Sequence, residues 1–149
     1  MKTQYISTKL ITLALLMCLT ALVPTSMADK GGIPVGIYSA TVNLADIPPG
    51  FPPEVADILV GTWFTELTDS GATVIRKDGD VVAYGTYTSS KSHFIIRDIG
   101  GPLACTDARG IATGVYTWSL ENNELTLSPV LDRCFGRMFV LTLRPLQQL

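Results

Sequence analysis

The sequence is poor in the side chains from which metal centres and nucleic-acid surfaces are built. It contains one histidine, His93, and three cysteines, and its Lys and Arg residues form no basic stripe. A single histidine argues against zinc, which takes three or four His, Cys or carboxylate ligands. Scattered basic residues argue against a nucleic-acid partner. The turn Gly100-Gly101-Pro102 precedes no helix and so does not predict a phosphate-binding loop. We therefore expect no metal, no cofactor and no nucleic acid.

The sequence also lacks an apolar run long enough to cross a membrane as a helix, which takes about 20 residues. Its longest run, residues 10–23, follows Lys2 and Lys9 and precedes the small residues around Ala28. This order is typical of a secretory signal peptide. We expect residues 1–28 to be the signal peptide, with cleavage after Ala28. Residues 29–149 then form a single domain that is secreted or periplasmic and has no membrane span.

Cys18 allows a second interpretation, a lipoprotein anchored at that cysteine. Met17 stands where a small residue is expected, and apolar residues continue past Cys18, so we favour the cleaved signal peptide. Cleavage removes Lys2 and Lys9 but no acidic residue. The net charge therefore changes from −2 to −4.

Cleavage leaves two cysteines, Cys105 and Cys134. An even number of cysteines in an exported chain predicts a disulfide. The bridge would close a loop of about 30 residues and stabilise the fold by roughly 3–4 kcal/mol on the chain-entropy model. Free thiols and a metal-binding pair are the alternatives.

Short segments rich in β-branched and aromatic residues, separated by turn signals, predict eight strands. We expect them at residues 36–44, 61–68, 72–77, 80–88, 92–98, 111–121, 124–130 and 138–144. Asp78-Gly79 is the strongest hairpin signal among the turns. One short helix is expected at residues 53–60, because Pro53 suits a helix start and Val55, Ile58 and Leu59 then share a face.

A glycine stands two residues before an aromatic ring at four places. The four pairs are Gly36 and Tyr38, Gly61 and Trp63, Gly85 and Tyr87, and Gly114 and Tyr116. Glycine lets a strand bend sharply, and we expect each ring to point inward. The whole pattern predicts an all-β fold: an antiparallel up-and-down barrel of eight strands, with the short helix before the Gly-x-Trp strand. Closure removes the exposed edges of a meander.

The long connections fall at one end of this predicted barrel. In an antiparallel meander, the links after the first, third, fifth and seventh strands share an end, and three of these four are long. The loops that carry Cys105 and Cys134 are two of them. The meander therefore brings both cysteines to the same end.

The motif Gly61-Thr62-Trp63 resembles the opening of the first strand in lipocalins and fatty-acid-binding proteins of the calycin superfamily. Arg144 stands where the arginine that packs across that Trp occurs in these proteins. Residues 98–105, 114–120 and 132–137 are similar to small exported bacterial lipocalin-like proteins. The resemblance covers about residues 36–145 and implies a barrel and a hydrophobic ligand, but no settled activity. In one departure, Gly61 starts at the end with the long loops, whereas the Gly-x-Trp end of lipocalins is the closed one.

Strand alternation predicts which side chains face the barrel interior. A cavity lined by Tyr87, Phe94, Tyr116 and Trp118 would hold an apolar ligand. The alternative is that these rings simply fill the barrel, as in many eight-stranded barrels. In the predicted eighth strand, Phe139, Leu141 and Leu143 would face inward.

Five charged residues cluster around the cysteine loops: Arg97, Asp98, Asp132, Arg133 and Arg137. The interpretation we prefer is that their ion pairs order these loops. The alternative is a charged rim that admits a substrate carboxylate to Arg137 or Arg97.

Three functions fit these features. The leading hypothesis is an exported binding module that holds a small hydrophobic molecule inside the barrel. The second is a barrel cyclase or isomerase, with Tyr87, Tyr116 or Thr65 as a buried polar group; we assign no catalytic residue. The third is a packed barrel that acts through residues 47–60 and 99–110 as an interaction or inhibitor protein. The oligomeric state is left open.

Overall fold

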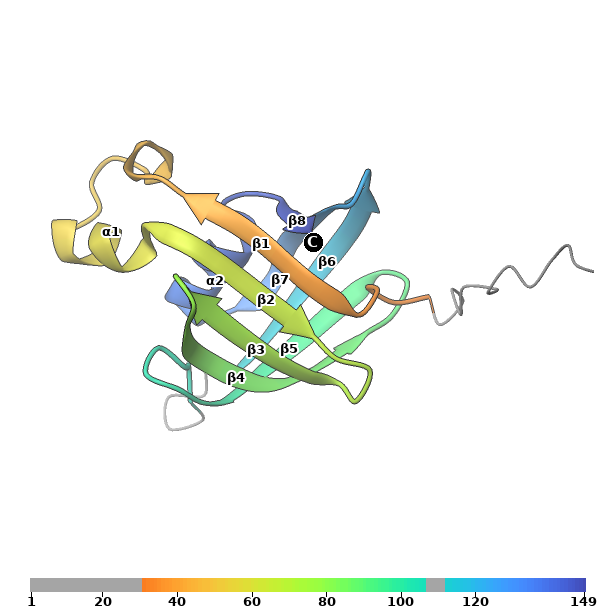
Figure 1. Ribbon diagram of the computed structural model, residues 1–149. Coiled ribbons are helices and arrows are strands. Elements are labelled where there is room, and N and C mark those ends of the chain that lie inside the picture. Colours follow the sequence, from red (N-terminus) through yellow and green to blue (C-terminus); the bar gives the residue numbers. More distant parts are fainter. Residues whose placement is uncertain (1–30, 107–111) are drawn as a thin grey trace, which may run out of the picture.

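The computed structural model describes residues 31–106 and 112–149. These residues form a closed antiparallel barrel in which each strand pairs with the next and the last returns to the first (Figure 1). The strands are β1 (Gly36–Val42), β2 (Gly61–Leu67), β3 (Ala72–Lys77), β4 (Asp80–Ser89), β5 (His93–Gly100), β6 (Thr113–Glu121), β7 (Glu124–Asp132) and β8 (Leu146–Gln148). The helices are η1 (Leu44–Asp46), α1 (Pro53–Leu59) and α2 (Phe135–Thr142). The predicted fold class is confirmed.

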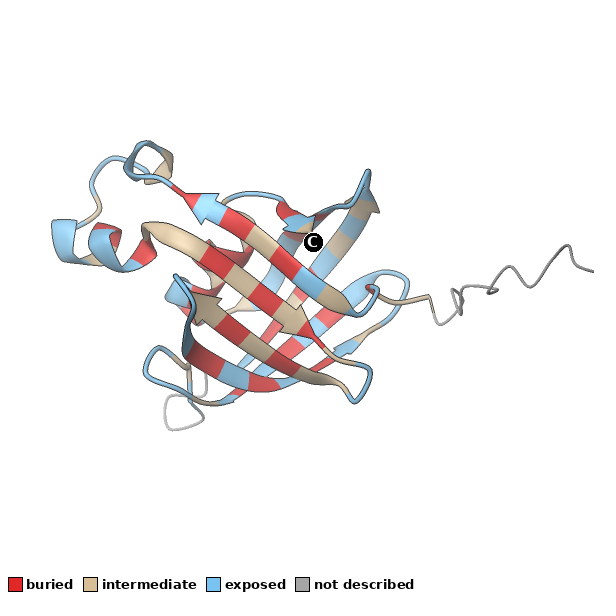
Figure 2. Ribbon diagram, viewed as in Figure 1, coloured by how far each residue is buried: buried red, intermediate tan, exposed pale blue. Residues whose placement is uncertain are grey.

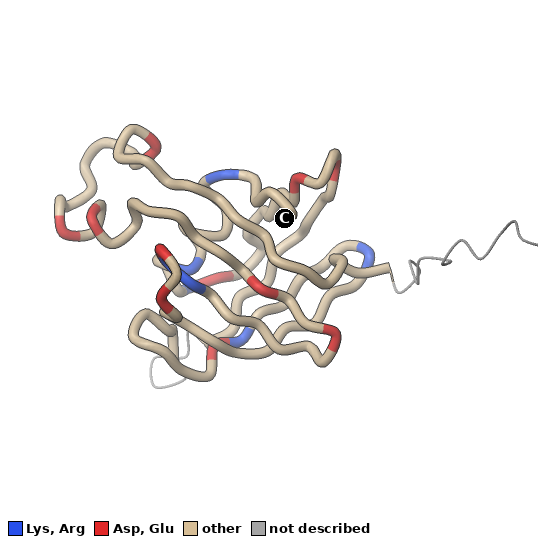
Figure 3. The backbone as a smooth tube through the Cα atoms, viewed as in Figure 1, with Lys and Arg blue, Asp and Glu red and all other residues tan. Residues whose placement is uncertain are grey.

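The predicted signal peptide, the cleavage site after Ala28 and Cys18 lie outside the described residues. Within the described ranges, no helix is both long and apolar enough to span a membrane. Figure 3 shows the charged residues of the described chain spread over strands and loops.

Buried and exposed side chains alternate along the strands, as the sequence pattern predicts (Figure 2). In β2, Trp63, Thr65 and Leu67 are buried, and in β5 Phe94 and Ile96 are buried. This alternation follows from the pleat, which turns successive side chains to opposite faces. The register of the barrel is therefore largely set by its apolar residues.

The four rings that follow a glycine by two residues all point into the core. Tyr38, Trp63, Tyr87 and Tyr116 are each at most 8% exposed. Gly61 begins β2 with φ at 140°, a backbone conformation that side chains with a Cβ rarely adopt. The glycine thus allows the sharp bend that places Trp63 inside.

The predicted strand at residues 138–144 is wrong. These residues belong mostly to α2, and the closing strand is the three-residue β8, which pairs with both β1 and β7. Arg137, Val140 and Leu141 are the buried residues of α2, a spacing of three and four that fits a helix face. The same short apolar run also fits a period of two, and periodicity alone cannot separate the two. Pro145 lies directly before the closing strand.

The two α-helices, α1 and α2, lie at the end of the barrel where β2 begins (Figure 1). The Trp63 indole N–H donates to the carbonyl of Leu59 at 2.7 Å and so fixes the end of α1. The centroid of the Phe51 ring lies 5.8 Å from that of Phe135 and 4.9 Å from that of Phe139. These contacts pack the segment that precedes α1 against α2. The Gly-x-Trp end of the barrel is therefore covered by helices.

The opposite end carries the turns after β2, β4 and β6 and is covered by the N-terminal lead. Ile33 is buried, and its N–H donates to Ser89 Oγ at 3.2 Å. The Tyr38 hydroxyl donates to the carbonyl of Pro34 at 2.7 Å, and burial raises the pKa of Tyr38 to about 12. This phenol remains a protonated donor at neutral pH and anchors the lead to β1.

Candidate functional site

A partly open cavity of about 370 Å³ lies between the two helices and the barrel. This volume is within the range of small-molecule sites. Six of its apolar wall residues come from strands, helices and the loop after β5: Leu59, Trp63, Ile75, Val82, Leu103 and Val140. Its polar wall consists of Asp98, Arg133 and Arg137 beside the two cysteines. The cavity therefore combines a large apolar face with one charged face.

Arg137 of this wall forms its most buried ion pair with Asp132, which does not line the cavity. Arg137 Nε lies 2.8 Å from Asp132 Oδ2, and Nη2 lies 2.7 Å from Oδ1. Their side chains are 2% and 0% exposed. The fork geometry gives a strong and directional contact. Burial alone would lower the pKa of Arg137, but the hydrogen bonds to Asp132 and the charge of Asp98 outweigh burial and raise it.

Asp132 also ties this pair to the barrel interior and to α2. The Tyr116 hydroxyl donates to Asp132 Oδ2, and burial followed by this hydrogen bond raises the pKa of Tyr116. The backbone N–H of Cys134 donates to Asp132 Oδ1 at 2.7 Å. Gly114 makes room for the carboxylate, since a Cβ there would lie 2.4 Å from Asp132 Oδ2. One carboxylate thus joins β6, β7 and α2.

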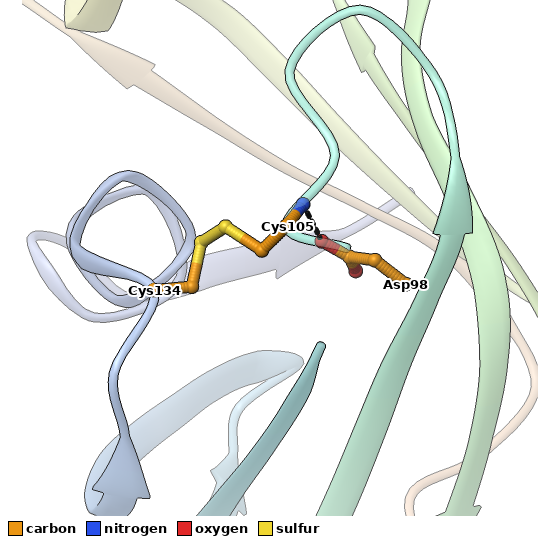
Figure 4. Close-up of side chains that lie close together, drawn as sticks. All are labelled: Asp98, Cys105 and Cys134. Carbon is orange, nitrogen blue, oxygen red and sulfur yellow. Dashed lines mark hydrogen bonds between the residues drawn. A yellow bond between two sulfur atoms is a disulfide. The ribbon is translucent and has the colours of Figure 1, made fainter. Parts of the chain in front are cut away.

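Asp98 is the carboxylate that lines the cavity itself, at the inward position of β5 that follows Phe94 and Ile96. Its Oδ2 lies 3.2 Å from Arg137 Nη1 and accepts the N–H of Cys105 at 2.8 Å (Figure 4). The Asp98 side chain is 3% exposed. These contacts match the interpretation that ion pairs order the cysteine loops.

Cys105 and Cys134 form the predicted disulfide, with their Cα atoms 6.0 Å apart (Figure 4). It joins the loop after β5 to the residue that precedes α2. Potential ligand atoms of Asp98 and the two cysteines lie within 4.8 Å of one another. The bridge removes both thiolates, however, and Asp98 already pairs with Arg137, so this set does not fit a cation while the disulfide is intact.

Replacing Cys105 with serine is expected to lower the melting temperature of the oxidised protein and to leave the reduced protein nearly unchanged. The stabilisation lost should be about 3–4 kcal/mol, because the bridge closes a loop of roughly 30 residues. Thermal unfolding of wild type and variant, each with and without reductant, measures this. Equal melting of the two oxidised proteins would contradict a stabilising disulfide.

The structure brings together three of the four residues predicted to bind ligand. Tyr87, Phe94 and Tyr116 are buried. The ring centroid of Phe94 lies 5.8 Å from that of Tyr87 and 6.2 Å from that of Tyr116. Trp118 is partly buried, and its indole N–H donates to the carbonyl of Ser90 at 2.8 Å, near the hairpin end. None of the four is among the residues that line the 370 Å³ cavity. That a ligand contacts them stays a prediction.

Of the residues predicted to have structural roles, Gly61 and Trp63 lie as expected at the start of β2. Arg144 forms an ion pair with Asp46, at 2.5 Å, and is largely exposed. The cation beside the Trp63 ring is Lys77, whose Nζ lies 6.0 Å from the ring centroid.

Sequence reasoning missed Asp98 as an inward residue of the site. The signal was present, since Asp98 shares the period-two face of Phe94 and Ile96. Arg137 was predicted as part of the charged cluster, but its burial was not predicted, because residues 138–144 were assigned to a strand and not to a helix that begins at Phe135.

No family model, curated protein or solved structure matches the chain. The closed barrel of antiparallel strands is compatible with a lipocalin-like fold.

Proposed function

We propose that this protein is an exported lipocalin-like barrel that binds a small hydrophobic molecule. The observation that carries the proposal is the 370 Å³ cavity at the helix-covered end, with its largely apolar wall. Removing apolar ligand surface from water is favourable by roughly 25 cal/mol per Å². The disulfide supports an extracytoplasmic location, because such bridges persist in oxidising compartments.

The packing of the barrel supports a ligand at this end. Tyr38, Phe94, Ile96 and Tyr116 are at most 1% exposed and fill the interior beyond the cavity. At about 30 Å³ for a water-sized group, the cavity accommodates roughly 12 non-hydrogen atoms. A short alkyl chain or a small bicyclic molecule meets that limit.

Exposed apolar side chains mark the entrance. Ile58 on α1 is 47% exposed, Leu103 is 42% exposed and Phe135 on α2 is 55% exposed, and all three line the cavity. Large apolar side chains that face water around a cavity favour a binding site over a purely structural void.

The proposal predicts that decanol quenches or shifts Trp63 fluorescence in a saturable way, because the Trp63 ring lines the cavity. The mature chain has two tryptophans, so Trp118→Phe leaves Trp63 as the sole reporter, and Trp63→Phe leaves Trp118. A response from Trp63 alone supports the cavity. A response from Trp118 alone would place the ligand near the predicted ring set instead.

A matched pair of variants tests the location. Ala83 lines the cavity and is 4% exposed, whereas Val81 of the same strand is 46% exposed. Ala83→Leu should fill part of the cavity and weaken decanol binding at least tenfold, while Val81→Leu should leave the Kd unchanged. No saturable binding by the wild-type protein, or equal Kd values for Ala83→Leu and wild type, would overturn the proposed site.

A further inference from the structure

We infer that Asp98 makes this cavity selective for apolar molecules that carry a hydrogen-bond donor, an alcohol or a protonated amine, and that it disfavours carboxylates. The inference rests on the proposed function and adds the chemical class of the ligand. It is carried by the geometry of Asp98 and by the charge balance of the wall around it.

The first step is the acceptor capacity of Asp98. Its Oδ2 is occupied by the N–H of Cys105 and by Arg137 Nη1. Both contacts fall on Oδ2, so the acceptor capacity of Oδ1 is left for other donors. An ionised carboxylate only accepts hydrogen bonds, and its two oxygens together offer about four acceptor sites. Since Asp98 lines the cavity, a ligand donor that reaches Oδ1 would use this capacity.

The second step is that Arg137 is already committed. Its Nε and Nη2 contact Asp132, and its Nη1 donates to the carbonyl of Ala112 at 2.7 Å and lies beside Asp98. Two carboxylates share this one guanidinium, so the buried group carries one net negative charge. A ligand carboxylate would therefore meet repulsion from Asp98 instead of a free guanidinium.

The third step concerns the entrance. The helix α1 contains Glu54 and Asp57 and no basic residue, and Lys77, whose Nζ donates to the carbonyl of Asp57 at 3.1 Å, offsets only one of these two negative charges (Figure 3). Arg133 is the opposing charge of the lining. It is exposed, and it has no ion-pair partner in the part of the chain that the structure describes. Water and salt screen a charge in that position far more than they screen the buried Asp98.

The experiment compares four probes with the same alkyl chain: decanol, decylamine, decyl methyl ether and decanoate. Each is titrated into the oxidised mature protein, with Trp63 as the reporter. Decanol and decylamine should bind about tenfold to a hundredfold more tightly than the ether, because only they donate to a charged acceptor. Decanoate should bind most weakly of the four.

Two variants assign the ranking to a residue. Asp98→Asn should lose the preference for decylamine and bind decanoate more tightly than the wild-type protein does. Arg133→Gln, the matched change at an exposed position of the same wall, should preserve the order of the four probes. If Asp98→Asn does not fold, the ranking of the four probes by the wild-type protein still decides the inference.

The outcomes separate the two proposals. Absence of binding by all four probes would overturn the proposed function. Binding of the ether or of decanoate as tightly as decanol would leave the binding cavity standing and overturn the role of Asp98. The role of Asp98 would also be overturned if decanoate were the tightest probe of the wild-type protein and Arg133→Gln lost decanoate binding. That result would assign the polar contact to Arg133.

Discussion

Replacing Arg137 with leucine is expected to lower the free energy of unfolding by about 3–5 kcal/mol. The guanidinium is 2% exposed and contacts two carboxylates, Asp98 and Asp132, that are themselves at most 3% exposed. Removing the cation leaves both carboxylates in the interior without a counter-charge, and that cost exceeds what the pair contributes while intact. Urea unfolding of the oxidised protein, followed by circular dichroism, measures the change.

Arg133→Leu is the matched control. It removes the same kind of side chain from a neighbouring position that is exposed, and surface changes of this kind usually alter stability by no more than about 0.5 kcal/mol. Arg137→Lys should recover only part of the loss, because an ammonium cannot form the two parallel contacts to Asp132. Equal stability of the two leucine variants would contradict the buried ion-pair cluster.

Replacing Trp63 with alanine should cost about 3–5 kcal/mol, the range for truncating a buried large side chain. The ring is 3% exposed, and its N–H holds the end of α1 through the carbonyl of Leu59. The variant loses core packing at the helix-covered end and the hydrogen bond that fixes α1 there. Thermal and urea unfolding of the oxidised variant both report the loss.

Trp63→Phe separates the two contributions. Phenylalanine keeps most of the ring volume but cannot donate to Leu59, so its cost should be clearly smaller than that of alanine. A loss below about 1 kcal/mol for Trp63→Ala would mean that Trp63 is not part of the core. The two tryptophan variants together show how much of the stability of this end depends on packing.

The helix α2 shows where sequence reasoning failed and why. Residues 138–144 alternate well enough to fit a strand. The barrel is closed instead by the three residues of β8, which pair with β1 on one side and β7 on the other. The preceding residues are then free to fold back over the barrel end, with Val140 and Leu141 buried and Phe139 against Phe51. The local pattern is the same for both conformations, so only the surroundings could select one.

The candidate site shows the same division between local and distant information. The alternation in β5 is sufficient to place Asp98 inward beside Phe94 and Ile96, although only the apolar residues were predicted from it. The position of Arg137 could not be obtained in that way. It depends on α2, and α2 depends on contacts with segments far away in the chain.

The sequence by itself determined the barrel, the inward rings of Tyr38, Trp63, Tyr87 and Tyr116, and the pairing of Cys105 with Cys134. These features follow from the alternation of side chains along each strand, from the turn residues, and from the rule that every second link of an antiparallel meander lies at the same end. All three can be read from residues that are close together in the chain or from the order of the strands. Tertiary structure decided that the barrel end is covered by α2, and that Arg137 of the cavity wall is buried between Asp98 and Asp132. Burying a charge is favourable only when its counter-charges are already in place, so that wall exists only in the closed fold.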